Sequence, residues 1–299
     1  MLKFLKQCII VTLLWIPLTT SQAIAQTNDS KWFKVERTGE GPPMLLIPGL
    51  SSSGDVWNQT IDHFRDQFEC HAFTLAGFAG VPPVKSEKFL PMVKENLIQY
   101  MEENLNEPAI IIGHSLGGFL GYWIGSERPD LLKVAVIVDS APSLAGLQFA
   151  QMAPKTRRQT INQIITGMES QTQEQFKAMQ ARIFASMIQD PDTAAAYSKW
   201  GKASDRNTVT QAMKELYSTD LSNQLSAMQV PTLHLYSWAP YAKYGATKES
   251  ILTILKKQTR LHPNITFSTH DTAWHFMMTD EPKWFFGEVE AFLKPILQQ

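Results

Sequence analysis

Short apolar runs alternate with amphipathic stretches over the first half of the chain. After a first strand predicted over Lys31–Glu40, mainly apolar segments of strand length recur at Met44–Ile47, Cys70–Leu75, Ala109–Ile112 and Val134–Val138. Between them, apolar residues fall at three- and four-residue spacing from Trp57 to Phe68 and over Phe89–Leu105, which predicts helices. Strands that alternate with helices are typical of a mostly parallel, twisted sheet flanked by helices. The predicted fold class is therefore α/β.

The pattern changes after residue 143. Residues 144–225 are rich in Gln, Met, Ala and Lys, and helical spacing recurs at Arg157–Met168, Gln173–Met187, Thr193–Lys202 and Val209–Leu216. Strand patterns return at Val230–Tyr236 and Asn264–Thr269, before a C-terminal helix at Pro282–Ile296. We interpret residues 26–142 and 226–299 as one core domain and residues 143–225 as an inserted helical cap that roofs the sheet edge.

The N-terminus has the three regions of a secretory signal peptide. Lys3 and Lys6 precede an apolar run from Cys8 to Leu18, and Ala23–Ala25 offers a cleavage site of the small-x-small type. We therefore predict a signal peptide over residues 1–25 and an exported protein, periplasmic or secreted. The apolar run is short for a bilayer span, so we expect no stable membrane anchor after cleavage, the alternative being an uncleaved N-terminal anchor.

Composition excludes several classes of function. The 299-residue chain has a net charge of −1 and no basic run, which argues against a nucleic-acid partner. Loss of residues 1–25 would leave Cys70 as the only cysteine, so no internal disulfide is expected. The sequence contains no metal-ligand motif and no glycine-rich dinucleotide motif after a strand, so we expect neither a metal nor another cofactor.

The most informative stretch is Ala109–Gly121, which reads AIIIGHSLGGFLG. It places a G-x-S-x-G pattern between a predicted strand and a predicted helix, the context of a nucleophilic serine on a sharp turn. Gly113 and Gly117 would remove the steric clashes that such a turn creates. The pattern predicts that Ser115 is a nucleophile; the alternative is a serine that caps a buried helix.

A nucleophilic serine needs a base, and the chain has seven histidines. His275 is favoured because it follows the last predicted strand and precedes Pro282, which opens the final helix. His270 lies in the same connection and is the rival. His114 adjoins Ser115 but is expected to point elsewhere on the turn. We interpret the remaining histidines as structural or solvated: His63, His71, His234 and His262.

These motifs, LLIPGL, GHSLGG and a late histidine followed by a proline-led helix, occur in an order that resembles the α/β-hydrolase superfamily. The resemblance runs from about Met44 to Leu297. It implies an α/β-hydrolase fold with Ser115 as nucleophile and His275 as base. It also implies that the backbone N–H groups of Leu50 and Leu116 form the oxyanion hole.

The acidic member of the triad departs from the superfamily's usual pattern. The usual position is the loop after the strand matching Val230–Tyr236, but here residues 237–244 contain no carboxylate. A minority of the superfamily carries the acid one strand earlier, where this chain has Asp139. Neighbouring strands lie about 4.8 Å apart, so Asp139 could reach the imidazole. Asp271 is the other candidate, and Asp139 could alternatively cap a turn.

The expected activity is hydrolysis of a carboxylic ester of a small to medium apolar molecule through an acyl-serine intermediate. Trp238 and Tyr241 are expected to line the substrate pocket. An amidase, peptidase, thioesterase or acyltransferase would use the same site and stays an alternative. A binding protein on an inactive hydrolase scaffold is an alternative of another class.

Overall fold

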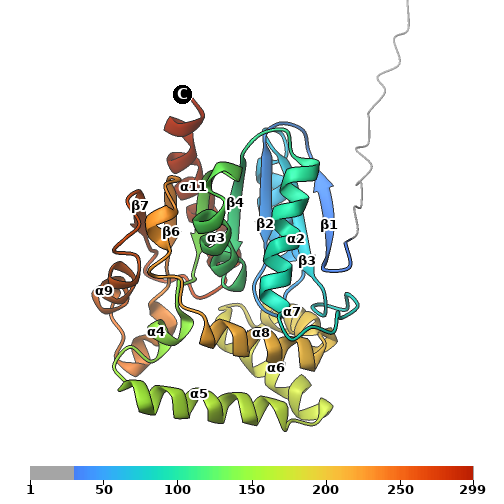
Figure 1. Ribbon diagram of the computed structural model, residues 1–299, viewed down its shortest axis with the longest axis vertical. Helices are drawn as coiled ribbons and strands as arrows, with labels where there is room; N and C mark the ends of the chain where they lie inside the picture. The colour runs from blue at the N-terminus through green and yellow to red at the C-terminus, as the bar shows by residue number, and fades with distance from the viewer. Residues whose placement is uncertain (1–29, 299) are drawn as a thin grey trace, which may run out of the picture.

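The computed structural model describes residues 30–298, and the predicted signal peptide lies outside this range. A seven-stranded sheet has the order β1-β3-β2-β4-β5-β6-β7 (Figure 1). Only the edge strand β1 runs antiparallel, against β3. The strands are β1 Phe33–Thr38, β2 Pro43–Ile47, β3 Glu69–Leu75, β4 Ala109–His114, β5 Leu132–Val138, β6 Thr232–Leu235 and β7 Ile265–Ser268. The predicted mostly parallel α/β fold is confirmed.

Helices cover both faces of this sheet because its strands are apolar on both sides. Alternate strand residues such as Leu45 and Ile111 pack with α2 and α3, whereas Leu46 and Ile112 pack with α1 and α11. The bounds of these helices are α1 Asn58–Phe64, α2 Phe89–Asn104, α3 Leu116–Glu127 and α11 Pro282–Leu297. The predicted helix at Phe89–Leu105 is thus confirmed to within one residue.

Five α-helices lie between β5 and β6 in the chain. They gather at one end of the sheet (Figure 1). They are α4 Leu144–Gln148, α5 Pro154–Glu169, α6 Gln173–Met187, α7 Pro191–Ala203 and α8 Arg206–Ser218. The N–H group of Leu221 donates to the carbonyl of Pro142, so the two segments that join these helices to the core meet. We call residues 143–225 the helical insertion; its role as a cap domain stays a prediction.

Sequence analysis did not predict α9, Lys248–Gln258, which lies between β6 and β7. A capping box of Thr247 and Ser250 begins this helix, and Ile251, Leu252 and Leu255 pack in a small apolar cluster beneath it. Both signals are present in the sequence at helical spacing. A short helix α10, Met277–Asp280, also precedes α11.

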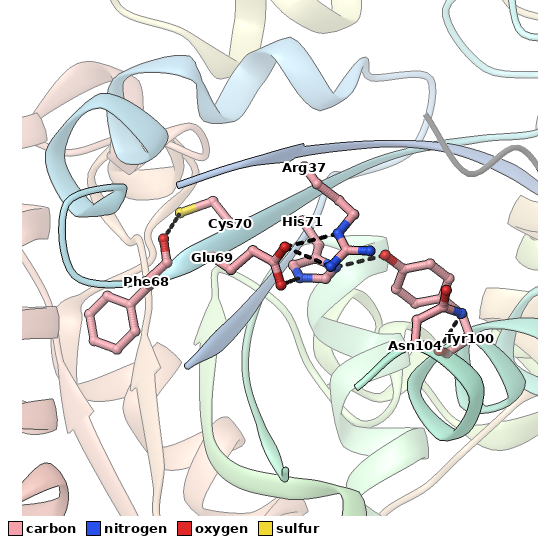
Figure 2. Close-up of polar contacts among 7 residues, drawn as sticks. All are labelled: Arg37, Phe68, Glu69, Cys70, His71, Tyr100 and Asn104. Atoms are coloured by element: carbon pink, nitrogen blue, oxygen red, sulfur yellow. Dashed lines mark hydrogen bonds and ion pairs between the residues drawn. The ribbon is translucent and has the colours of Figure 1, made fainter. Parts of the chain in front are cut away.

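A polar cluster lies at the start of β3 (Figure 2). Buried His71 lies 2.7 Å from the Tyr100 hydroxyl through Nδ1 and 3.0 Å from Glu69 through Nε2. Glu69 also accepts from Arg37 at 2.6 Å, which keeps it ionised and therefore an acceptor. Nε2–H of His71 thus donates to Glu69, and Nδ1 accepts from Tyr100. His71 is a structural histidine, as interpreted from the sequence.

Candidate active site

Ser115 stands on a strained turn between β4 and α3, with φ 53° and ψ −115°. A Cβ atom added at Gly113 would lie 2.3 Å from the carbonyl oxygen of Gly117, and one at Gly117 would lie 2.1 Å from that of Ile47. Only glycine fits at these two close approaches. The Ser115 side chain makes no capping hydrogen bond to α3, so the alternative of a helix-capping serine is wrong.

Residues with strained backbone dihedral angles lie where neighbouring strands end. In the described range, four residues other than glycine have positive φ: Ser51, Ala79, Ser115 and Asp139. Ser115 and Asp139 directly follow the paired strands β4 and β5, and Ser51 lies in the loop after β2. Such strain costs about 1–3 kcal/mol per residue and clusters at functional sites.

His275 and Asp139 meet across this edge although 136 positions separate them in the chain. Nδ1 of His275 lies 2.5 Å from Oδ2 of Asp139, and the two side chains are only 12% and 13% exposed. The rivals lie elsewhere: Asp271 is 73% exposed and faces Lys248 at 3.4 Å, and His270 faces Glu281 at 3.7 Å. The geometry therefore favours the pair His275 and Asp139.

Ser237 fixes the Asp139 carboxylate from the end of β6. Its N–H group donates to Oδ1 at 2.7 Å and its hydroxyl donates to Oδ2 at 2.8 Å. Sequence analysis missed this role. Its position in the sequence could have revealed this role, because Ser237 lies in the segment where the superfamily usually places its acid.

His114 links the serine turn to the loop that carries His275. Its Nε2–H donates to the His275 carbonyl at 3.0 Å, and the two ring centroids are 4.5 Å apart. Complete burial, and secondarily the neighbouring His275, holds the pKa of His114 well below 6.5, so the ring is neutral. This contact was not predicted, because sequence analysis only placed His114 beside the serine and pointing elsewhere.

The two predicted oxyanion donors belong to segments that flank Ser115. Leu116 is the first residue of α3, at the positive end of the helix dipole. Leu50 follows Gly49, where an added Cβ would lie 3.1 Å from Cβ of Ser115. The Ser140 hydroxyl fixes the turn from behind by donating to the Ser115 carbonyl at 2.6 Å. The roles of Leu50 and Leu116 stay predictions.

Trp238 and Tyr241 lie in the segment after β6, at a 3-10 helix over Ala239–Tyr244. Tyr241 is 38% exposed as a residue. Burial together with the nearby charge of Asp139 raises the pKa of Tyr241. The indole N–H of Trp238 is buried without a partner in the described part of the chain. The segment thus borders Asp139, and the pocket-lining role stays a prediction.

Within residues 30–298 no group of three or more His, Cys, Asp and Glu side chains could hold a metal ion. In that same range no helix is both long and apolar enough to cross a bilayer.

The arrangement of serine turn, histidine loop and sheet edge agrees with a comparison against known families. The model of a family described as "Alpha/beta hydrolase family" matches residues 44–288. The chain belongs to the alpha/beta hydrolase family. The match includes Ser115, Asp139 and His275 of the hydrolase, together with the whole helical insertion.

Individual relatives of the hydrolase are distant. A pimeloyl-[acyl-carrier protein] methyl ester esterase of Aeromonas hydrophila is 26% identical over 204 residues, covering 68% of this chain and 78% of the relative. An esterase from Thermogutta terrifontis superposes with a TM-score of 0.73 at 16% identity, covering 91% of this chain and 99% of that one. The enol-lactonase from Burkholderia xenovorans gives 0.71 at 14% identity, covering 88% and 96%. The two structural likenesses show the fold alone.

Proposed function

We propose that this hydrolase is a serine esterase that cleaves a carboxylic ester through an acyl-serine intermediate. The observation that carries the proposal is the 2.5 Å contact of His275 Nδ1 with Asp139, the residue after Val138, whose carbonyl accepts from the N–H group of Ser115 at 2.9 Å. The similarity of this chain to a protein named as a methyl ester esterase supports ester cleavage.

In the proposed reaction, the Ser115 hydroxyl attacks the ester carbonyl and its proton passes to Nε2 of His275. Asp139 holds Nδ1–H and stabilises the imidazolium. The N–H groups of Leu50 and Leu116 bind the tetrahedral oxyanion, where each such donor is worth about 3–4 kcal/mol in related enzymes. His275 then protonates the leaving alcohol, and water repeats the sequence to release the acid and restore Ser115.

We propose an apolar substrate of small to medium size, and the environment of His275 supports this. The next residue, Phe276, is buried against Phe184 of α6 at 5.7 Å and Tyr197 of α7 at 5.9 Å between ring centroids. Aromatic side chains of the helical insertion therefore pack beside the proposed base. Trp238 and Tyr241 are proposed to complete the substrate-binding wall.

The test has two parts. A fluorophosphonate probe should label the wild-type protein on Ser115, as located by peptide mass spectrometry, and should not label Ser115→Ala. Rates on methyl and aryl esters of increasing chain length, with matched thioesters and amides, should rank esters first. Faster thioester or amide cleavage would reassign the bond, and the absence of an adduct would favour a binding protein.

We also propose that the mature enzyme acts outside the cytoplasm, after removal of residues 1–25. The support is the charge and apolar pattern of that segment. The described part of the chain holds a single cysteine, Cys70, which is free and buried, so no disulfide forms within it. Burial raises the pKa of the Cys70 thiol to about 12, which makes it unreactive in an oxidising compartment.

A further inference from the structure

A cavity of about 410 Å³ lies where the helical insertion joins the core. Its walls come from the outgoing segment around Ser143 and Gly146, the returning segment Asp220–Asn223, the first turn of α5, and the end of α9. Figure 1 shows α4, α5 and α9 on the same side of the molecule. Ser115, Asp139 and His275 do not line this cavity.

Three basic side chains from different segments face the cavity. Arg157 comes from α5, Lys257 from the end of α9, and Arg260 from just beyond it. In the described range none of them forms an ion pair; Arg260 donates to the Asn223 side chain at 3.2 Å instead. Asp220 is the one carboxylate of the lining and accepts from the Ser222 N–H at 2.9 Å. The lining therefore has an excess of positive charge.

Two buried hydrogen-bond donors in the lining have no partner among the described residues. Gln258 is only 8% exposed, and its Oε1 accepts from the Ser143 N–H at 3.0 Å. Its Nε2 is buried and unpaired, as is Nε of Arg157. An added Cβ at Gly146 would lie 3.0 Å from this Nε2. Buried donors are normally satisfied, so two unpaired donors in the lining of one cavity are exceptional.

The helix dipole of α9 does not account for these features. Basic residues in a last turn favour the negative helix end, which explains Lys256 and Lys257. It does not explain why Arg157 of the insertion faces the same cavity, nor why the Gln258 amide is buried without an acceptor.

We propose that this cavity binds a small organic anion through a carboxylate or phosphate group. Arg157, Lys257 and Arg260 would supply the charge, and the Gln258 amide would supply a neutral donor. The volume suits a small molecule, since ligand cavities are about 300–1,000 Å³. A bound anion would contact both connections of the helical insertion and α9 at once, so binding is expected to stabilise the insertion on the core.

The test measures binding of succinate, glycerol 3-phosphate and inorganic phosphate to wild-type protein by calorimetry, with sodium chloride matching the ionic strength. At least one should bind saturably and raise the unfolding temperature above the chloride control. Arg157→Gln and Lys257→Gln should each weaken binding at least tenfold. Arg158→Gln and Lys256→Gln remove the same charge from exposed neighbours outside the lining and should change it less than twofold.

The probes separate the two chemistries. Binding of succinate alone assigns a carboxylate ligand, and binding of the two phosphates alone assigns a phosphate group. The absence of saturable binding by all three, or equal losses in the lining and control variants, would overturn the proposal. Ser115→Ala should bind the anion as wild type does, so failure of the proposed esterase function leaves this test unaffected.

Discussion

The Ser237 hydroxyl donates to the same carboxylate oxygen of Asp139 that lies 2.5 Å from His275 Nδ1. The Ser237 N–H group donates to the other oxygen at 2.7 Å. Two donors of Ser237, just after β6, thus hold the Asp139 carboxylate in place while it faces the His275 imidazole. An acid on β5 can therefore occupy the place of the acid that the superfamily usually carries after β6.

Asp139→Asn should lower kcat about 10³- to 10⁴-fold on an ester substrate, because an amide no longer selects the tautomer that leaves Nε2 free to accept a proton. The fold should persist, since the replacement is nearly isosteric. Asp271→Asn is the matched control and should retain activity within about twofold, because this exposed carboxylate faces Lys248. Loss of activity in the Asp271 variant alone would reassign the acid.

Ser237→Ala removes one hydrogen bond to the Asp139 carboxylate and leaves the backbone donor in place. Hydrogen bonds to charged groups are worth about 1.5–3 kcal/mol, so kcat should fall about 10- to 100-fold if the bond is needed to orient the acid. KM should change little. Ser250→Ala, an exposed serine of α9, is the control. Unchanged kcat in Ser237→Ala would show that the backbone N–H suffices.

Much of the site was predictable from the sequence because its signals are local. The strand, the G-x-S-x-G turn and the helix around Ser115 are contiguous, and the late histidine precedes a proline-led helix. Asp139 was favoured because strand spacing put it within reach of His275. Helix α6 matches its prediction, Gln173–Met187, for the same reason of local periodicity.

The missed contacts join residues that are far apart in the chain. Ser237 meets Asp139 across 98 positions, and His114 meets the His275 carbonyl across 161. A serine after a strand and a histidine before a nucleophile have many local interpretations, and only the packing of β4, β5 and β6 side by side selects one.

His114→Leu should reduce both stability and kcat. The substitution removes the donor to the partly buried His275 carbonyl, and a lost hydrogen bond of this kind costs about 1 kcal/mol. The loop that carries the base would also lose its tie to the serine turn. Urea unfolding and ester turnover test the two effects. His63→Leu is the control, because His63 is a partly exposed residue of α1 that faces Glu290. Equal effects in both variants would contradict a special role for His114.

The full-length chain expressed in a bacterial host should be recovered from the periplasm, with Gln26 as its first residue. Edman sequencing or intact mass tests the cleavage site. Lys3→Glu combined with Lys6→Glu removes the positive region and should hold the precursor in the cytoplasm. A mature protein that retains residues 1–25 in the membrane fraction would favour the uncleaved anchor.

The fold should lose stability in mild acid. Burial is the main cause that lowers the pKa of four histidines below the ordinary 6.5: His71, His114, His234 and His262. The pKa values of His234 and His262 fall to about 4. Near pH 7.5 they are neutral in both the folded and unfolded states. As the pH falls through 6.5, these histidines bind protons in the unfolded chain but stay neutral in the folded chain. The free energy of unfolding therefore decreases.

The size of this loss follows from proton counting. His234 and His262 each contribute about 1.4 kcal/mol per pH unit between pH 6.5 and about 4, or about 3 kcal/mol per pH unit together, and His71 and His114 act in the same direction. Asp280 acts in the opposite sense, because burial raises its pKa and the folded state then binds the extra proton. The loss should therefore become steep about one pH unit below 6.5, where the unfolded histidines are almost fully protonated and His234 and His262 of the folded state are not. Urea unfolding at pH 7.5, 6.0 and 5.0 measures it. His234→Gln should make the dependence shallower. A free energy of unfolding that stayed constant over this range would show that the buried histidines accept protons in the folded state.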